Sequence, residues 1–180
     1  MNGKPGQAGA RSARIATLSD QEALAIVDLI AGEFATTETP AGEKEQSAAL
    51  AAAFAATGTA IDLSPSATAD AAVAGRAARE LLGIMAEVPE MQDALDIWLA
   101  VPPQQEALAV PLLIVVPAVF AGCIALLQVL GHSRFKRDST GRWEFEYDAA
   151  TKTSMDQTLP VVVKTMGDLV RPLTRRGGAG

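Results

Sequence analysis

The chain has 180 residues, of which 49% are hydrophobic but only 4% aromatic, and its formal net charge is −6. This length suits one domain or two very small ones, and a net negative chain is not expected to bind nucleic acid. A single cysteine and a single histidine exclude an internal disulfide framework, a multi-cysteine metal site and a histidine cluster.

The two ends of the chain, residues 1–18 and 173–180, are predicted to be disordered tails. The first contains MNGKPGQAGARSARIA, in which the basic residues are not followed by an apolar stretch, so it is not expected to be a secretory signal. The last residues, TRRGGAG, are small or basic and offer nothing to a core.

Residues 19–106 are predicted to be an acidic helical region. Its first helix is expected over 19–35, because apolar residues recur there at helical spacing. Ser19 is a suitable N-cap and Glu22 stands three residues later, which is the spacing of a capping box.

Three further helices are expected in this region, over 47–58, 66–88 and 90–100, with Pro89 between the last two. Gly58 and Ser66 are the expected end of one helix and cap of the next. Four helices with short joints predict a small bundle. Residues 1–106 hold 6 Lys/Arg and 15 Asp/Glu, so we expect this region to bind a protein partner through an acidic surface.

Residues 107–131 carry no charged side chain and form either a membrane span or a buried helix. A run of about 18 apolar residues is enough to cross a bilayer. The basic residues that follow it would then place the C-terminus in the cytoplasm, as in a single-pass inner-membrane protein. However, Pro111 and Pro117 leave only 117–130 as an unbroken helix, which suits the core of a cytoplasmic protein.

Small side chains follow Pro117 at helical spacing: Ala118, Ala121, Gly122 and Ala125. They would allow a second helix to approach closely, either in lipid or in a protein core. Cys123 lies among them in apolar surroundings, which raise the pKa of a thiol, so we expect a structural cysteine rather than a nucleophile.

A β-hairpin is predicted over 133–147. If residues 139–141 form a three-residue loop with Gly141 in the left-handed conformation, Phe135 faces Phe145 and Arg137 faces Trp143. One face of the hairpin then carries four aromatic side chains, which are Phe135, Trp143, Phe145 and Tyr147. The other face carries opposite charges across the strands, and a shift of one residue would destroy both patterns.

The last helix is predicted after Pro160, and Arg171–Pro172 is expected to end it. Since a two-stranded hairpin is not stable alone, its aromatic face needs a cover. We expect that cover from this helix and from the apolar segment, so that 132–172 form a small α+β unit.

Residues that could carry chemistry are few. The chain has no G-x-S-x-G, Walker A, G-x-G-x-x-G or H-E-x-x-H motif, so no catalytic residue, cofactor or metal site is expected. His132 is expected to be an ordinary surface residue. The basic residues of the hairpin are Arg134, Lys136, Arg137 and Arg142, and acidic residues across the strands are expected to neutralise much of the charge of this cluster.

Two stretches, LSDQEALAIVDLIA and RFKRDSTGRWEFEYDAATKTSMDQTLPVVVKTMGDLV, resemble small uncharacterised bacterial proteins. Those proteins are associated with caspase-like, CHAT-like and STAND NTPase defence or cell-death systems. The resemblance implies an accessory or effector role, and no catalytic residues are carried over from it.

The sequence as a whole therefore predicts a mostly helical protein with a small α+β unit at its C-terminal end. Its expected function is that of a non-enzymatic bacterial interaction protein, anchored to a membrane as part of a conflict system. The alternative is a soluble cytosolic adaptor with 117–130 as a buried core helix. Either form could assemble with a second copy of itself.

Overall fold

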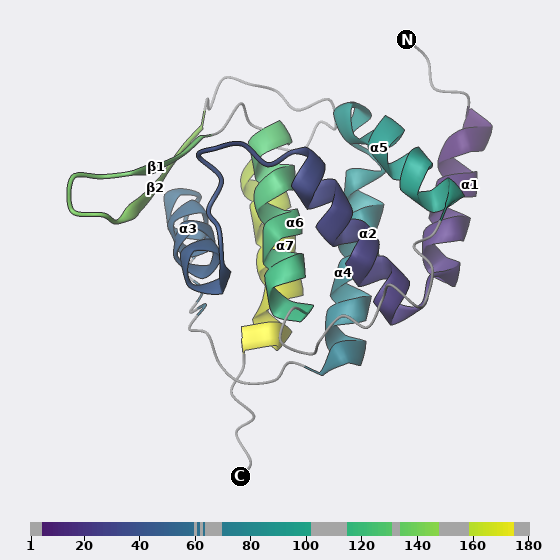
Figure 1. The fold of residues 1–180 in the computed structure, drawn as a ribbon, viewed down its shortest axis with the longest axis horizontal. Coiled ribbons are helices and arrows are strands. Elements are labelled where there is room, and N and C mark those ends of the chain that lie inside the picture. Colours follow the sequence, from purple (N-terminus) through teal and green to yellow (C-terminus); the bar gives the residue numbers. More distant parts are fainter. Residues whose placement is uncertain are drawn as a thin grey trace.

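The computed structural model describes residues 5–59, 61, 63, 70–101, 115–130, 134–147 and 159–174. These residues form a mostly helical fold with one antiparallel hairpin and a C-terminal helix, which confirms the predicted fold class (Figure 1). The elements in chain order are α1 (Pro5–Thr17), α2 (Asp20–Glu33), α3 (Glu43–Ala56), α4 (Ala71–Met85), α5 (Pro89–Ala100), α6 (Val115–Leu130), β1 (Arg134–Arg137), β2 (Trp143–Glu146) and α7 (Leu159–Thr174).

Helix α6 lies at the centre of the fold. It contacts α2, α3, α4 and α7, which surround it (Figure 1). Phe120, Ile124 and Leu127 on this helix are fully or almost fully buried. No helix in the described part of the chain is both long enough and apolar enough to cross a bilayer.

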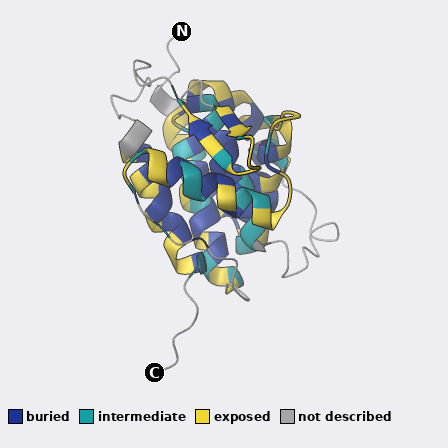
Figure 2. Cartoon of the chain, turned by 90° about the vertical axis from the view of Figure 1, so that its left-hand side faces the viewer, coloured by how far each residue is buried: buried dark blue, intermediate teal, exposed yellow. Residues whose placement is uncertain are grey.

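One continuous core runs through the fold and includes buried side chains from every helix. Buried residues occupy the inward sides of the helices, while exposed residues occupy the outer sides and most of the hairpin (Figure 2). Much of this core is alanine, so its larger anchors, such as Ile26, Phe54 and Leu81, carry most of the apolar area removed from water.

The start of α2 has the geometry that its sequence predicts. Ser19 Oγ accepts a hydrogen bond from the backbone N–H of Glu22, at 3.2 Å, and the Glu22 carboxylate accepts one from the backbone N–H of Ser19, at 2.8 Å. This is the reciprocal capping box, which satisfies two N–H groups that the helix itself leaves unpaired.

Helix α3 begins four residues earlier than the predicted 47–58, at Glu43. The turn before it depends on Gly42, whose φ of +83° is a conformation that other residues avoid. The Glu45 side chain then accepts a hydrogen bond from the backbone N–H of Ala41, at 3.2 Å. Acidic residues in the first turn are favourable, because they lie at the positive end of the helix dipole. The segment was predicted to be a loop because it is polar.

The hairpin has the predicted register, with Phe135 opposite Phe145 and Arg137 opposite Trp143. Gly141 has a φ of +82°, as the predicted loop requires. The Phe135 and Phe145 rings lie 5.0 Å apart and both are buried. Trp143 and Tyr147, on the same face, are half-buried.

The cover of this aromatic face differs from the prediction. The main contact of the hairpin is between β2 and α3, while α7 packs on α3, α4 and α6 (Figure 1). Helix α3 can take this position because Leu50 and Phe54 give it a buried side. The predicted C-terminal hairpin and helix are present, and they share one core with the N-terminal helices.

Helix α7 also passes the residue that was expected to end it. Pro172 lies inside the helix, which continues to Thr174. A proline costs the helix one backbone hydrogen bond, but it does so here in the last turn. Leu173 is buried, and its packing keeps this turn helical. Residues 173 and 174, which were predicted to lie in a tail, therefore belong to α7.

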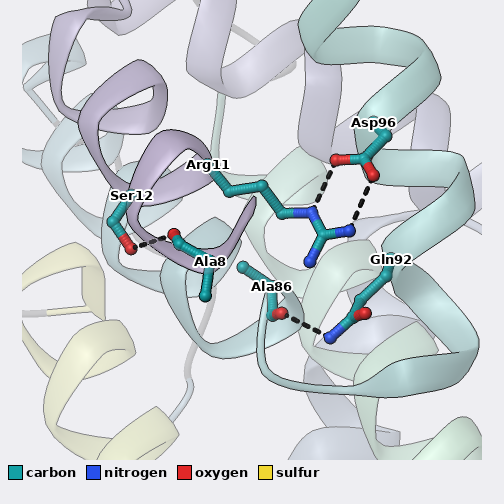
Figure 3. A network of polar contacts seen from close by, with 6 residues as sticks. All are labelled: Ala8, Arg11, Ser12, Ala86, Gln92 and Asp96. Carbon is teal, nitrogen blue, oxygen red and sulfur yellow. Dashed lines mark hydrogen bonds and ion pairs between the residues drawn. The ribbon is translucent and has the colours of Figure 1, made fainter. Parts of the chain in front are cut away.

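The prediction of a disordered tail over 1–18 is wrong for the residues of α1. Ile15 and Leu18 are buried. The Arg11 guanidinium donates hydrogen bonds to both carboxylate oxygens of Asp96 on α5, at 2.5 and 2.7 Å (Figure 3). Asp96 is 85 positions from Arg11 in the sequence, so only the folded chain reveals this contact of α1. Ser12 Oγ by contrast donates to the backbone carbonyl of Ala8 in its own helix, at 3.2 Å.

The Arg11–Asp96 pair should make the docking of α1 sensitive to acid. The hydrogen bonds from Arg11 are the main reason that the pKa of Asp96 lies below its usual value. Because the pKa of Asp96 is lower in the folded than in the unfolded protein, its carboxylate stabilises the fold at pH values above its unfolded pKa of about 4. This stability is lost as the pH falls through the pKa of the folded protein. We expect the hydrogen-exchange protection of α1 amides to drop below about pH 4, with a loss of at most about 1 kcal/mol because the pair is partly exposed.

Replacing Arg11 isolates this contribution. Arg11→Ala should lower the hydrogen-exchange protection of the α1 amides at pH 7, and this protection should then no longer fall in acid. Ser12→Ala should leave the protection at pH 7 and its fall in acid unchanged. The same acid-dependent loss in Arg11→Ala would mean that other carboxylates govern the docking of α1.

Several sequence-based predictions lie outside the described residues. They concern Pro111, the cap at Ser66, the environment of His132 and the ends of the chain. Asp70 is the N-cap that the structure describes for α4, and its carboxylate accepts a hydrogen bond from the backbone N–H of Ala72, at 3.0 Å.

Candidate protein-interaction surfaces

The turn of the hairpin is held by one carboxylate. Asp138 Oδ1 accepts hydrogen bonds from the hydroxyl of Thr140, at 2.6 Å, and from the backbone N–H groups of Thr140 and Arg142, at 2.8 and 2.9 Å. The Thr140 hydroxyl and then the Arg142 N–H are the main causes that hold the pKa of Asp138 below its usual value. Because these contacts favour one turn geometry, the strands leave the loop in a defined register.

A cleft with a volume of about 500 Å³ lies between β1 and the loop that joins α2 to α3. Residues 37–39 and Ala41 form one wall, and the successive residues 135–137 of β1 form the other. Glu45 and Trp143 complete the lining. We call this feature the hairpin cleft, and its size is within the range of known ligand sites.

Charged side chains border the hairpin cleft in pairs. The Arg137 guanidinium lies over the Trp143 ring, 4.9 Å from its centroid, and forms an ion pair with Glu45. On the opposite face of the hairpin, Lys136 bonds to Glu146 at 2.6 Å, diagonally across the strands rather than to Glu144 directly opposite. These pairs are exposed, so each adds little to stability and leaves its basic group accessible to a partner.

A second surface lies on α5. Glu90, Asp93, Ile97 and Val101 follow one another at helical spacing and all are exposed. Ile97 is 60% exposed and Val101 is 70% exposed, although both are large and apolar. We call these four residues the α5 stripe.

Helix α5 is joined to α2 by a side-chain contact. The Trp98 indole N–H donates to the Glu33 carboxylate at 2.7 Å, so a further acidic group lies beside the C-terminal turn of α5. The position of this apolar pair among carboxylates could not be derived from the sequence, where Ile97 and Val101 look like any other residues of a helix.

The small residues predicted for close helix packing lie mostly inside the fold. Ala118, Gly122 and Ala125 are buried on α6, while Pro117, in the first turn, and Ala121 are half-buried. A Cβ atom on Gly122 would stand only 2.4 Å from Val27 Cγ1 and 2.8 Å from Leu81 Cδ2. At Gly122, therefore, side chains of α2 and α4 pack directly against α6.

The described residues offer neither an activated cysteine nor a cluster of metal ligands. Cys123 is fully buried, and desolvation raises the pKa of its thiol to about 12, so it is protonated at neutral pH. Within the described ranges, no group of three His, Cys, Asp or Glu side chains is placed to hold a metal ion.

Comparisons with known proteins found no matching family model, no matching curated protein and no matching solved structure.

Proposed function

We propose that this protein is a non-enzymatic adaptor that binds a partner protein through the α5 stripe. The observation that carries the proposal is the exposure of Ile97 and Val101, 60% and 70%, one helical turn apart. Burying two such side chains in an interface is worth about 1.5–3 kcal/mol each, which is enough to anchor a partner.

The charge around these anchors defines the partner. Glu90 and Asp93 precede them on the stripe, and Asp28 and Glu33 are exposed on the neighbouring α2. We therefore expect a partner surface with an apolar centre and a basic rim. Such a rim would raise the association rate and make it sensitive to salt.

The adaptor proposal uses α6 as its core. Its burial by α2, α3, α4 and α7 supports a role for 117–130 as a core helix rather than as an anchor in lipid. The resemblance of the sequence to accessory proteins of bacterial conflict systems supports the expectation that the partner belongs to such a system.

The test is capture of the partner from cells that express the protein, followed by titration of the purified partner. We expect the double variant Ile97→Glu/Val101→Glu to weaken binding at least tenfold. The matched control is Val161→Glu on α7, which changes another exposed apolar residue (48% exposed) and should alter the affinity less than twofold.

Two results would contradict the proposal. One is a purified partner whose affinity falls as much with Val161→Glu as with the double variant. The other is recovery of the wild-type protein in the membrane fraction after a high-salt wash, which would favour the membrane-anchored alternative.

A further inference from the structure

The outer edge of β1 presents backbone groups at strand spacing that have no partner among the described residues. Asp138 N–H donates to Arg142 O at 2.9 Å, so these two residues form a hydrogen-bonded pair of the ladder. Such pairs alternate in an antiparallel ladder, so the backbone groups of Lys136 and Arg134 also point toward β2. Those of Phe135 and Arg137 therefore point outward, away from β2.

Nothing in the described part of the chain pairs with this outer edge. No hydrogen bond between described residues involves the backbone N–H or C=O of Phe135 or Arg137. These two residues and Lys136 between them line the hairpin cleft. The cleft thus runs beside two donors and two acceptors spaced to receive another strand.

We propose that β1 binds an extended acidic peptide of a partner protein by strand addition in the hairpin cleft. The backbone of the peptide would pair with Phe135 and Arg137, which is a recognised way to bind a chain at a sheet edge. This site lies on a different part of the molecule from the α5 stripe and does not depend on it.

The side chains of β1 define the peptide. Arg134 and Lys136 are exposed on the outer face of the strand, and Arg137 lies on the inner face. Peptide residues beside Arg134 and Lys136 should therefore be acidic, and the residue beside Phe135 should be apolar. The expected motif alternates acidic and apolar residues.

The same charges argue against a second copy of β1 as the occupant. An antiparallel pair of two such strands, joined through Phe135 and Arg137, would place Lys136 opposite its own counterpart, and like charges across strands are destabilising. Basic side chains on an edge strand are a common means of preventing such self-pairing.

The probe is the peptide acetyl-Glu-Val-Glu-Val-Glu-Val-Glu-amide. Its binding is measured by NMR hydrogen exchange on the full chain. We expect the amides of Phe135 and Arg137 to exchange at least tenfold more slowly at saturating peptide. Those of Trp143 and Phe145, on the far edge, should not change. A peptide of the same sequence in which every residue is N-methylated is the matched control and should not protect any amide.

Two variants at one position separate the backbone from the side chain. Arg137→Ala removes the guanidinium but keeps the outward N–H, whereas Arg137→Pro removes both and leaves the ladder to β2 intact. We expect Arg137→Pro to bind at least tenfold more weakly than Arg137→Ala. Lys164→Glu, on the exposed side of α7, should bind as the wild type does.

Three outcomes would overturn the proposal. The first is equal protection by the N-methylated peptide. The second is equal affinity of Arg137→Ala and Arg137→Pro, with both variants shown by the amide spectrum to retain the hairpin. The third is displacement of the peptide by an equimolar oligothymidine, which would identify a nucleic-acid site instead.

Discussion

Gly122→Ala should lower the free energy of unfolding by about 1–3 kcal/mol, although alanine is the better helix former. The added methyl carbon would lie 2.4 Å from Val27 Cγ1 and 2.8 Å from Leu81 Cδ2. Val27 is β-branched and fully buried on α2, so it has no free rotamer into which to move. Helices α6 and α2 must therefore separate, which loosens the centre of the core. Urea unfolding followed by circular dichroism measures the loss.

The matched control is Gly83→Ala on α4, another glycine inside a helix. A methyl group there meets no atom within 4 Å, so only the helix propensity changes. We expect this variant to gain about 0.5–1 kcal/mol. If both variants were stabilised by the same amount, α6 would not pack against α2 and α4 as described.

Phe54→Ala should have a larger effect, a loss of about 3–5 kcal/mol in the free energy of unfolding. Phe54 is fully buried, and Leu50 is the only other large apolar side chain among the buried residues of α3. Because α3 lies between the hairpin and α6, the loss of the Phe54 ring should also weaken the packing of the hairpin on the helices. Urea unfolding gives the first effect, and faster exchange of the β1 and β2 amides gives the second.

Phe34→Ala is the control for this prediction. It removes the same ring from the end of α2, where the side chain is only half-buried, and should cost less than half as much. Equal losses would show that the two rings contribute alike and that α3 is not the link between the hairpin and the bundle.

The elements that could be predicted in detail are those whose cause is local. The capping box of α2 depends on Ser19 and Glu22, three residues apart, and the hairpin register depends on Gly141 and the pairing beside it. In both cases the residues that make the structure are neighbours in the sequence, so their chemistry could be derived without knowledge of the fold.

The features that could not be predicted depend on partners distant in the sequence. Helix α1 has few large apolar residues and is held by Asp96, which is 85 positions from Arg11. The hairpin lies on α3 rather than on its chain neighbours. Both interaction surfaces were missed for the same reason. The hairpin cleft forms only because the fold brings β1 close to residues 37–41. The α5 stripe can be identified only when the side of α5 that other helices leave exposed is known.

Helix α6 is buried among α2, α3, α4 and α7, and the reactivity of Cys123 tests most directly whether this core forms without lipid. This is the chain's single cysteine and it is fully buried at the middle of α6. In detergent-free buffer, we predict that a thiol reagent such as DTNB does not label the native protein. Labelling should begin only in urea, with the same midpoint as the loss of helical circular dichroism. Immediate labelling of a helical protein, or protection that appears only when lipid vesicles are added, would contradict the claim.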